Sequence, residues 1–134
     1  MKNIKPLATK KPPLPQADHG IIDDWLAGVM PVINPVVSEL DRLIRKQLKD
    51  PVFAVKWSKA YYGTPQLGWC IELAAYHVSA NVVFLNGSRL ARPPELGDES
   101  RYVKIRSVEE ANSPEVLAWI RESCSLPGWG ADQE

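Results

Sequence analysis

The chain has 134 residues, with 16 Lys or Arg and 16 Asp or Glu, so its formal net charge at pH 7 is zero. This length fits one domain, which can bury roughly two thirds of the surface of its unfolded chain without disulfides or metals. A net charge of zero gives no overall electrostatic reason to expect nucleic acid or an anionic membrane as a partner.

The first 20 residues, MKNIKPLATKKPPLPQADHG, contain four lysines and four prolines and show no periodic apolar face. This composition predicts a flexible, basic, Pro-rich tail that includes His19. The prolines interrupt any apolar run, so we expect neither a secretory signal nor a membrane span, and we expect a cytoplasmic location. A Pro-x-x-Pro spacing runs from Pro12 to Pro15, but we favour a solvated tail over a peptide-recognition motif.

Apolar residues recur at three- and four-residue steps from Ile21 to Leu48, which is the spacing of one helix face. Asn34 and Pro35 have the order of an N-cap followed by a proline in the first turn. We therefore expect a short helix near 21–30 and a longer one near 35–49.

The apolar period then changes to two, and the chain becomes rich in β-branched and aromatic residues. Strands are predicted at 52–57, 67–78, 81–86 and 101–107. Ser79 and Ala80 form a link short enough for an antiparallel hairpin. Within 67–78, alternation places Trp69 and Ile71 on the helix-covered face, and Cys70 and Glu72 on the opposite face.

A last helix is expected to begin with Ser113 as its N-cap and Pro114 in its first turn. Residues 127–134 are predicted to form a C-terminal tail, from which Trp129 could pack back onto the folded domain of residues 21–126. The order of helices, strands and helix predicts an α+β, two-layer sandwich. We expect a mainly antiparallel sheet of about four to five strands, with the N-terminal helices and the C-terminal helix on one face.

The uncovered sheet face is predicted to carry aromatic and charged side chains, a combination suited to binding a small molecule or a protein partner. The loop between Gly87 and Arg101 could contribute to the same site, and Asn86-Gly87 is expected to form a turn where positive φ is easy. The candidate ligand-binding residues are Trp57, Tyr61, Glu72, Tyr76, His77, Arg89, Arg101 and Lys104. A solvated face with cross-strand ion pairs is the simpler interpretation.

The sequence contains no diagnostic catalytic motif, and we assign no catalytic residue. An enzyme alternative would use His77 and Glu72 as acid and base, although no nucleophile turn surrounds a nearby serine. Cys70 and Cys124 lack metal-ligand spacing and are predicted to be buried thiols, so no metal site is predicted.

A nucleic-acid-binding alternative is less favoured. It requires four basic side chains to converge on one patch, namely Lys56, Lys59, Lys104 and Arg106. The sequence also leaves open a homodimer.

The stretch from Ile22 to Cys124 resembles the YdhG-like family, a domain of unknown function. The resemblance depends on the helix ending before Pro51 and on VKW at 55–57, VVFLNGSRL at 82–90 and RYVKIR at 101–106. It implies a two-layer α+β fold similar to secretion-chaperone-like domains, and most members have no assigned function.

One bacterial member of that family is described as a frataxin-like iron chaperone for iron–sulfur and haem assembly. The resemblance therefore implies iron as a cofactor that is held weakly by carboxylates. Here the carboxylates would be Asp23, Asp24, Glu39 and Asp41, which are interspersed with Arg42, Arg45 and Lys46. Our leading expectation is a small, non-enzymatic YdhG-like domain that binds a ligand or a protein partner.

Overall fold

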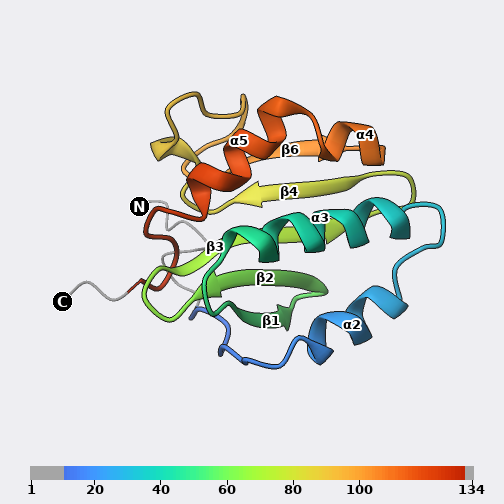
Figure 1. The fold of residues 1–134 in the computed structure, drawn as a ribbon, viewed down its shortest axis with the longest axis horizontal. Coiled ribbons are helices and arrows are strands. Elements are labelled where there is room, and N and C mark those ends of the chain that lie inside the picture. Colours follow the sequence, from blue (N-terminus) through green and yellow to red (C-terminus); the bar gives the residue numbers. More distant parts are fainter. Residues whose placement is uncertain (1–10, 132–134) are drawn as a thin grey trace, which may run out of the picture.

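A computed structural model describes residues 11–131 as a six-stranded antiparallel sheet with helices on one face (Figure 1). The helices are α2 (Gly20–Ala27), α3 (Asn34–Gln47), α4 (Val108–Ala111) and α5 (Pro114–Ser123), and a 3-10 turn, η1, spans Gly87–Arg89. The strands are β1 (Val52–Lys56), β2 (Lys59–Thr64), β3 (Gly68–Ala75), β4 (Ala80–Phe84), β5 (Leu96–Gly97) and β6 (Arg101–Ile105). The predicted α+β class, with N-terminal and C-terminal helices packed on a mainly antiparallel sheet, is confirmed.

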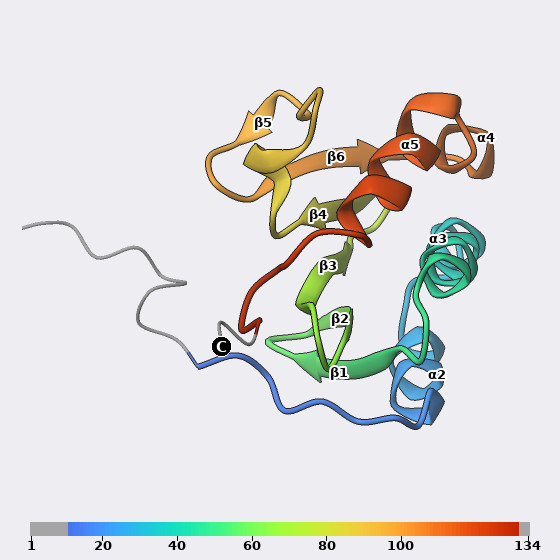
Figure 2. The ribbon, with the colours of Figure 1, turned by 60° about the vertical axis from the view of Figure 1, so that its left-hand side comes forward.

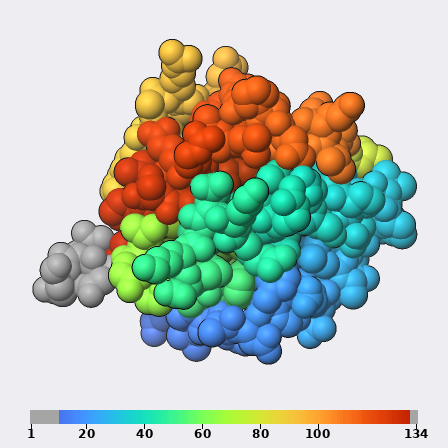
Figure 3. Space-filling view, in the orientation of Figure 1, coloured from blue at the N-terminus to red at the C-terminus, as the bar shows by residue number. Residues whose placement is uncertain are grey.

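The strands lie in the order β1-β2-β3-β4-β6-β5, with every neighbouring pair antiparallel. Figure 2 shows α2, α3, α4 and α5 on one side of this sheet, and in the space-filling view of Figure 3 the helices cover most of that side. We call the opposite side the open face. Within residues 11–131, no helix is long and apolar enough to cross a membrane.

Helix α3 supplies the centre of the helical layer. Its apolar stripe is buried against the sheet through Val36, Val37, Leu40, Leu43 and Ile44. The predicted proline in the first turn is present, but the prediction that Asn34 is the N-cap is wrong, because Ile33 occupies that position without a side-chain cap. The Asn34 amide instead donates to the carbonyl of Leu26 at 2.9 Å, which joins the end of α2 to the start of α3.

Strands β1 and β2 form a hairpin that the sequence pattern did not reveal. Lys56 pairs with Lys59, so Trp57 and Ser58 are the two turn residues, with φ of 54° and 63°. Two-residue hairpins of this kind need positive φ at both positions and usually contain Asn-Gly. A left-handed backbone costs a non-glycine residue about 1–2 kcal/mol. The chain therefore holds a tryptophan in a strained turn.

Ser58→Gly is expected to raise the free energy of unfolding by about 0.5–1 kcal/mol, because glycine adopts positive φ without a steric cost. Urea denaturation followed by circular dichroism would measure the change. Ser88→Gly is the matched control, since Ser88 is also exposed but its φ is not positive. Equal destabilisation by both substitutions would contradict the strain at Ser58.

A β-bulge at Cys70 changes which side chains face the helices. The register passes from Tyr62 opposite Ile71 to Gly63 opposite Trp69, so Cys70 is an extra residue in β3. Trp69 consequently faces the open side and Cys70 lies in the main core, the reverse of the predicted alternation. Ile71 lies in the core as predicted. Burial raises the pKa of the Cys70 thiol to about 12.

Glu39 on α3 connects the two C-terminal helices to the helical layer. Arg42 donates to its two carboxylate oxygens at 2.9 and 2.7 Å, and the Asn112 amide between α4 and α5 donates to one of them at 2.9 Å. The hydrogen bonds from Arg42, followed by that from Asn112, lower the pKa of Glu39 from 4.5 to about 2. The folded state therefore favours the ionised carboxylate.

Glu39→Gln is expected to destabilise the protein at pH 7, and the difference from the native chain should shrink as the pH falls from about 4.5 to about 2. A lowered pKa gives stability that is present above the unfolded pKa and is lost as pH falls through the folded one. Urea midpoints measured at several pH values across this range would test it. Glu95→Gln, at an exposed loop carboxylate, is the control, and a pH-independent Glu39→Gln difference would contradict the argument.

Candidate functional site: the aromatic open face

Four aromatic side chains gather on the open face, and we call them the aromatic cluster: Trp57, Tyr61, Trp69 and Trp129. The Tyr61 ring is at their centre, with centroid distances of 6.0 Å to Trp69, 6.1 Å to Trp57 and 6.3 Å to Trp129. The rings of Trp57 and Trp129 are stacked at 6.3 Å. The hairpin turn, β2, β3 and the C-terminal segment each contribute one ring.

A buried carboxylate, that of Glu72, contacts the cluster through Tyr61. Tyr61 and Glu72 are cross-strand partners, and the Tyr61 hydroxyl donates to Glu72 Oε2 at 3.0 Å. Lys59, two residues earlier in β2, places its Nζ 3.5 Å from the same oxygen. Burial and the Glu72 charge raise the pKa of the Tyr61 phenol well above its usual range. Tyr61 therefore stays protonated as a donor, and Glu72 and Lys59 form a compensated ion pair beside it.

Tyr76 and Lys104 extend the same face towards the other end of the sheet. Lys104 Nζ lies 5.4 Å from the centroid of the Tyr76 ring and donates to Asn81 Oδ1 at 3.2 Å. Tyr76 is 48% exposed and Trp57 is 41% exposed, which is high for large apolar side chains. Both rim a groove of about 540 Å³ between the end of α2 and the β1–β2 hairpin, whose other walls include Trp25, Val29, Met30 and Val55.

Five of the eight sequence-predicted residues thus share the open face: Trp57, Tyr61, Glu72, Tyr76 and Lys104. His77 is exposed in the turn between β3 and β4. It is five residues from Glu72 along the chain, a separation of roughly 17 Å if extended. The acid–base pair of the enzyme alternative is therefore not brought together.

The two predicted arginines belong to the loop that precedes β6. Arg101 donates to the carbonyls of Asp98 at 2.5 Å and Pro94 at 2.8 Å, so its guanidinium holds its own loop. Arg89 is exposed in η1. Gly87 does not have positive φ, contrary to expectation. Its glycine is required by crowding instead, because a Cβ there would lie 2.5 Å from Cβ of Arg101.

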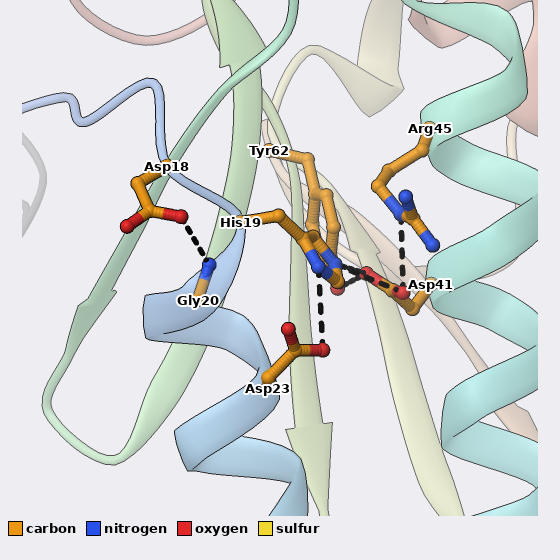
Figure 4. A network of polar contacts seen from close by, with 7 residues as sticks. All are labelled: Asp18, His19, Gly20, Asp23, Asp41, Arg45 and Tyr62. Atoms are coloured by element: carbon orange, nitrogen blue, oxygen red, sulfur yellow. Dashed lines mark hydrogen bonds and ion pairs between the residues drawn. The ribbon is translucent and has the colours of Figure 1, made fainter.

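A second polar constellation lies on the helix-covered side, centred on Asp41 (Figure 4). The Tyr62 hydroxyl donates to Asp41 Oδ1 at 2.7 Å, and Arg45 Nε donates to Oδ2 at 3.2 Å. His19 Nε2 lies 3.0 and 3.1 Å from the two oxygens, and its Nδ1 lies 3.3 Å from Asp23. Sequence reasoning placed His19 in the tail and missed this contact. Asp41 was the sequence signal for this contact, since it is a carboxylate within the apolar stripe of a helix. A buried carboxylate needs hydrogen-bond donors around it.

The carboxylates considered for iron do not form a cluster. Glu39 is paired with Arg42, and Asp41 is surrounded by Tyr62, His19 and Arg45. In the part of the chain that the structure describes, no group of three or more His, Cys, Asp or Glu side chains is placed to hold a metal ion.

Three of the four basic side chains considered for nucleic acid already have partners, among them Lys104 as described above. Lys59 contacts Glu72, and Lys56 Nζ lies 5.0 Å from the centroid of the Trp57 ring. The backbone N–H of Arg106 donates to Glu110 at 2.6 Å, beyond the end of β6. The lysines share the open face, but a carboxylate lies among them.

The aromatic cluster and the Tyr61–Glu72–Lys59 contacts lie on the side of the sheet that no helix covers, and the adjoining groove lies at its edge, where the end of α2 forms one wall. The Asp41 constellation lies behind the sheet and ties structural elements together. No family model, no curated protein and no solved structure matches the chain.

Proposed function

We propose that this protein is a non-enzymatic binding module that holds a segment of a partner protein against the aromatic open face. The supporting observation is that Trp57 and Tyr76 are 41% and 48% exposed at the rim of the groove, whereas Tyr61 and Trp69 of the aromatic cluster are buried and hold Trp57 in place from within. Exposed aromatic side chains supply large contact areas with little conformational entropy to lose, and they dominate binding energy at protein interfaces. The strained turn at Trp57 adds to this, since backbone strain concentrates at functional sites.

The charge distribution favours a protein segment over nucleic acid. Glu72 lies beside Tyr61 and compensates Lys59. A phosphate backbone crossing the cluster would meet that carboxylate, whereas single-strand binding surfaces present uncompensated cations between stacking rings. A polypeptide offers neutral carbonyls and apolar side chains, which fit both the rings and the groove beside Tyr76.

Selection of a displayed random-peptide library on the immobilised full chain would test the proposal. We expect enriched peptides that bind the native protein and lose about tenfold or more in affinity for Trp57→Ala and for Tyr76→Ala. Val108→Ala is the control, since Val108 is 41% exposed, like Trp57, but lies in α4. Peptides that bind all three variants equally would overturn the proposal. So would salt-dependent binding of single-stranded RNA without any peptide selected.

The YdhG-like resemblance and the iron-chaperone role implied by it stay predictions. Anaerobic titration of ferrous iron into the purified chain is the direct test of the second. Absence of binding at micromolar iron would remove the iron role and leave the binding-module proposal unaffected.

A further inference from the structure

Two segments that are far apart in the sequence meet at Trp69. On one side, the backbone of Trp129 pairs with that of Trp69 through two hydrogen bonds of 2.8 Å each. On the other, the Trp69 indole Nε1 donates to the carbonyl of Pro13 at 3.0 Å, and Pro13 is buried. The described part of the predicted N-terminal tail therefore lies against the fold.

The chain after Pro13 is anchored to the edge of the sheet. Gln16 exchanges two backbone hydrogen bonds with Phe53 on β1, at 2.8 and 2.7 Å. Pro12 lies against the C-terminal segment, since a Cβ built on Gly130 would be 3.0 Å from Pro12 Cγ. Residues 12–15, Pro-Pro-Leu-Pro, thus run from the contacts with Trp69 and the C-terminal segment to the backbone pairing of Gln16 with β1.

The chemistry of this contact is that of proline-rich peptide recognition. Proline has no N–H, so a proline-rich segment cannot add to a sheet as a regular strand and offers carbonyls and ring faces instead. Aromatic grooves bind such segments by packing rings against pyrrolidines, and an indole N–H can donate to a backbone carbonyl. The extended polyproline conformation is already favoured in the free chain, so binding loses little entropy.

We propose that the end of the sheet around Trp69 and Trp129 is a binding groove for proline-rich segments of partner proteins, and that residues 12–15 occupy it as an intramolecular ligand. This inference rests on the proposed function, because it uses the same aromatic cluster and specifies what binds there. A space of about 350 Å³ remains beside the segment, lined by Val52, Pro65, Trp69 and Trp129 among others. Leu14 is 84% exposed, so the apolar side chain of the intramolecular segment is not packed against the groove.

The intramolecular segment determines how tightly a partner must bind in order to displace it. A ligand tethered by a short link has an effective concentration in the millimolar range, so it competes strongly with a free peptide of the same sequence. If the peptide alone binds with a dissociation constant of about 100 μM, the tethered copy weakens the apparent affinity about tenfold.

The test uses the synthetic peptide KKPPLPQ, which has the sequence of residues 10–16. Its binding is measured calorimetrically to the native chain and to the full-length variant P12S/P13S/P15S. We expect the serine variant to bind the peptide about tenfold more tightly than the native chain does. The peptide KKSSLSQ should bind neither protein.

Trp69→Phe, added to the serine variant, removes the indole donor but keeps an aromatic ring, and it should weaken peptide binding by about tenfold. Trp119→Phe in the same background is the matched control. The Trp119 indole also donates to a backbone carbonyl, that of Arg92 at 2.6 Å, but it lies on α5. The control should leave peptide binding unchanged. Equal losses from both substitutions would overturn the assignment to Trp69.

Failure of KKPPLPQ to bind the serine variant at millimolar concentration, with an unchanged circular dichroism spectrum, would overturn the inference. If library-selected peptides still depended on Trp57 and Tyr76, the proposed function would stand and only the proline-rich ligand would fall. A native dimer that disappears in the serine variant would overturn the intramolecular occupancy, because the segment would then fill the groove of a second copy.

Discussion

Replacing Asp41 with alanine is expected to lower the free energy of unfolding by about 2–4 kcal/mol. Asp41 is 3% exposed and accepts a hydrogen bond from Tyr62, which is fully buried. Without the carboxylate, the Tyr62 hydroxyl becomes a buried donor with no acceptor, and both His19 and Arg45 lose their shared partner. Urea denaturation of the purified variant would measure the loss.

Tyr62→Phe distinguishes the loss of the whole Asp41 carboxylate from the loss of one of its hydrogen bonds. It removes a single donor and leaves Asp41 with His19 and Arg45, so it should cost about 1 kcal/mol. A loss for Asp41→Ala no larger than that for Tyr62→Phe would show that the other two contacts add nothing. His19→Ala should fall between them, since it releases the start of α2 from α3.

Gly63→Ala is expected to cost about 3 kcal/mol. A Cβ at this position would lie 1.9 Å from the carbonyl oxygen of Gly68, in the neighbouring strand of the sheet. Backbone cannot move there without breaking the β2–β3 pairing. Thermal and urea denaturation would both report the loss. Gly28→Ala is the control, because its nearest atom would be 3.7 Å away, and it should change stability by less than about 0.5 kcal/mol.

Gly128→Ala would meet an obstacle of the same size, with its Cβ 2.0 Å from the Trp69 carbonyl oxygen. We expect a smaller loss of stability than for Gly63→Ala, because the C-terminal segment can leave the sheet while β2 cannot. Near-ultraviolet circular dichroism should change as Trp129 separates from Trp57. An unchanged aromatic spectrum with a loss as large as that of Gly63→Ala would contradict this explanation.

Local sequence signals predicted the parts of the fold that depend on local physics. Ser113 and Pro114 begin α5 as expected, and the Ser113 hydroxyl accepts the backbone N–H of Val116 at 3.2 Å. The apolar period from Ile21 to Leu48 gave both N-terminal helices, and alternation in β3 placed Glu72 on the open face, as the structure has it. The class of the fold followed from the order of these elements.

The remaining features depend on contacts that no local pattern encodes. One extra residue at Cys70 inverts the alternation of β3, so Trp69 appeared to belong to the core when it lies in the candidate site. The Trp57-Ser58 turn lacks the Asn-Gly signature that would have revealed β2. His19 reaches Asp41 across 22 residues, and Pro13 reaches Trp69 across 56. Such pairings are set by tertiary packing and cannot be read from spacing.

The contact of Pro12 with Gly130 also makes the chain suitable for circular permutation. Because these two positions already touch, a short peptide linker could join them and new ends could be opened at the exposed turn of His77 and Val78. Such a circular permutant should fold with the same sheet order. It would hold the proline segment at Trp69 from both sides, which would convert a displaceable ligand into a permanent one.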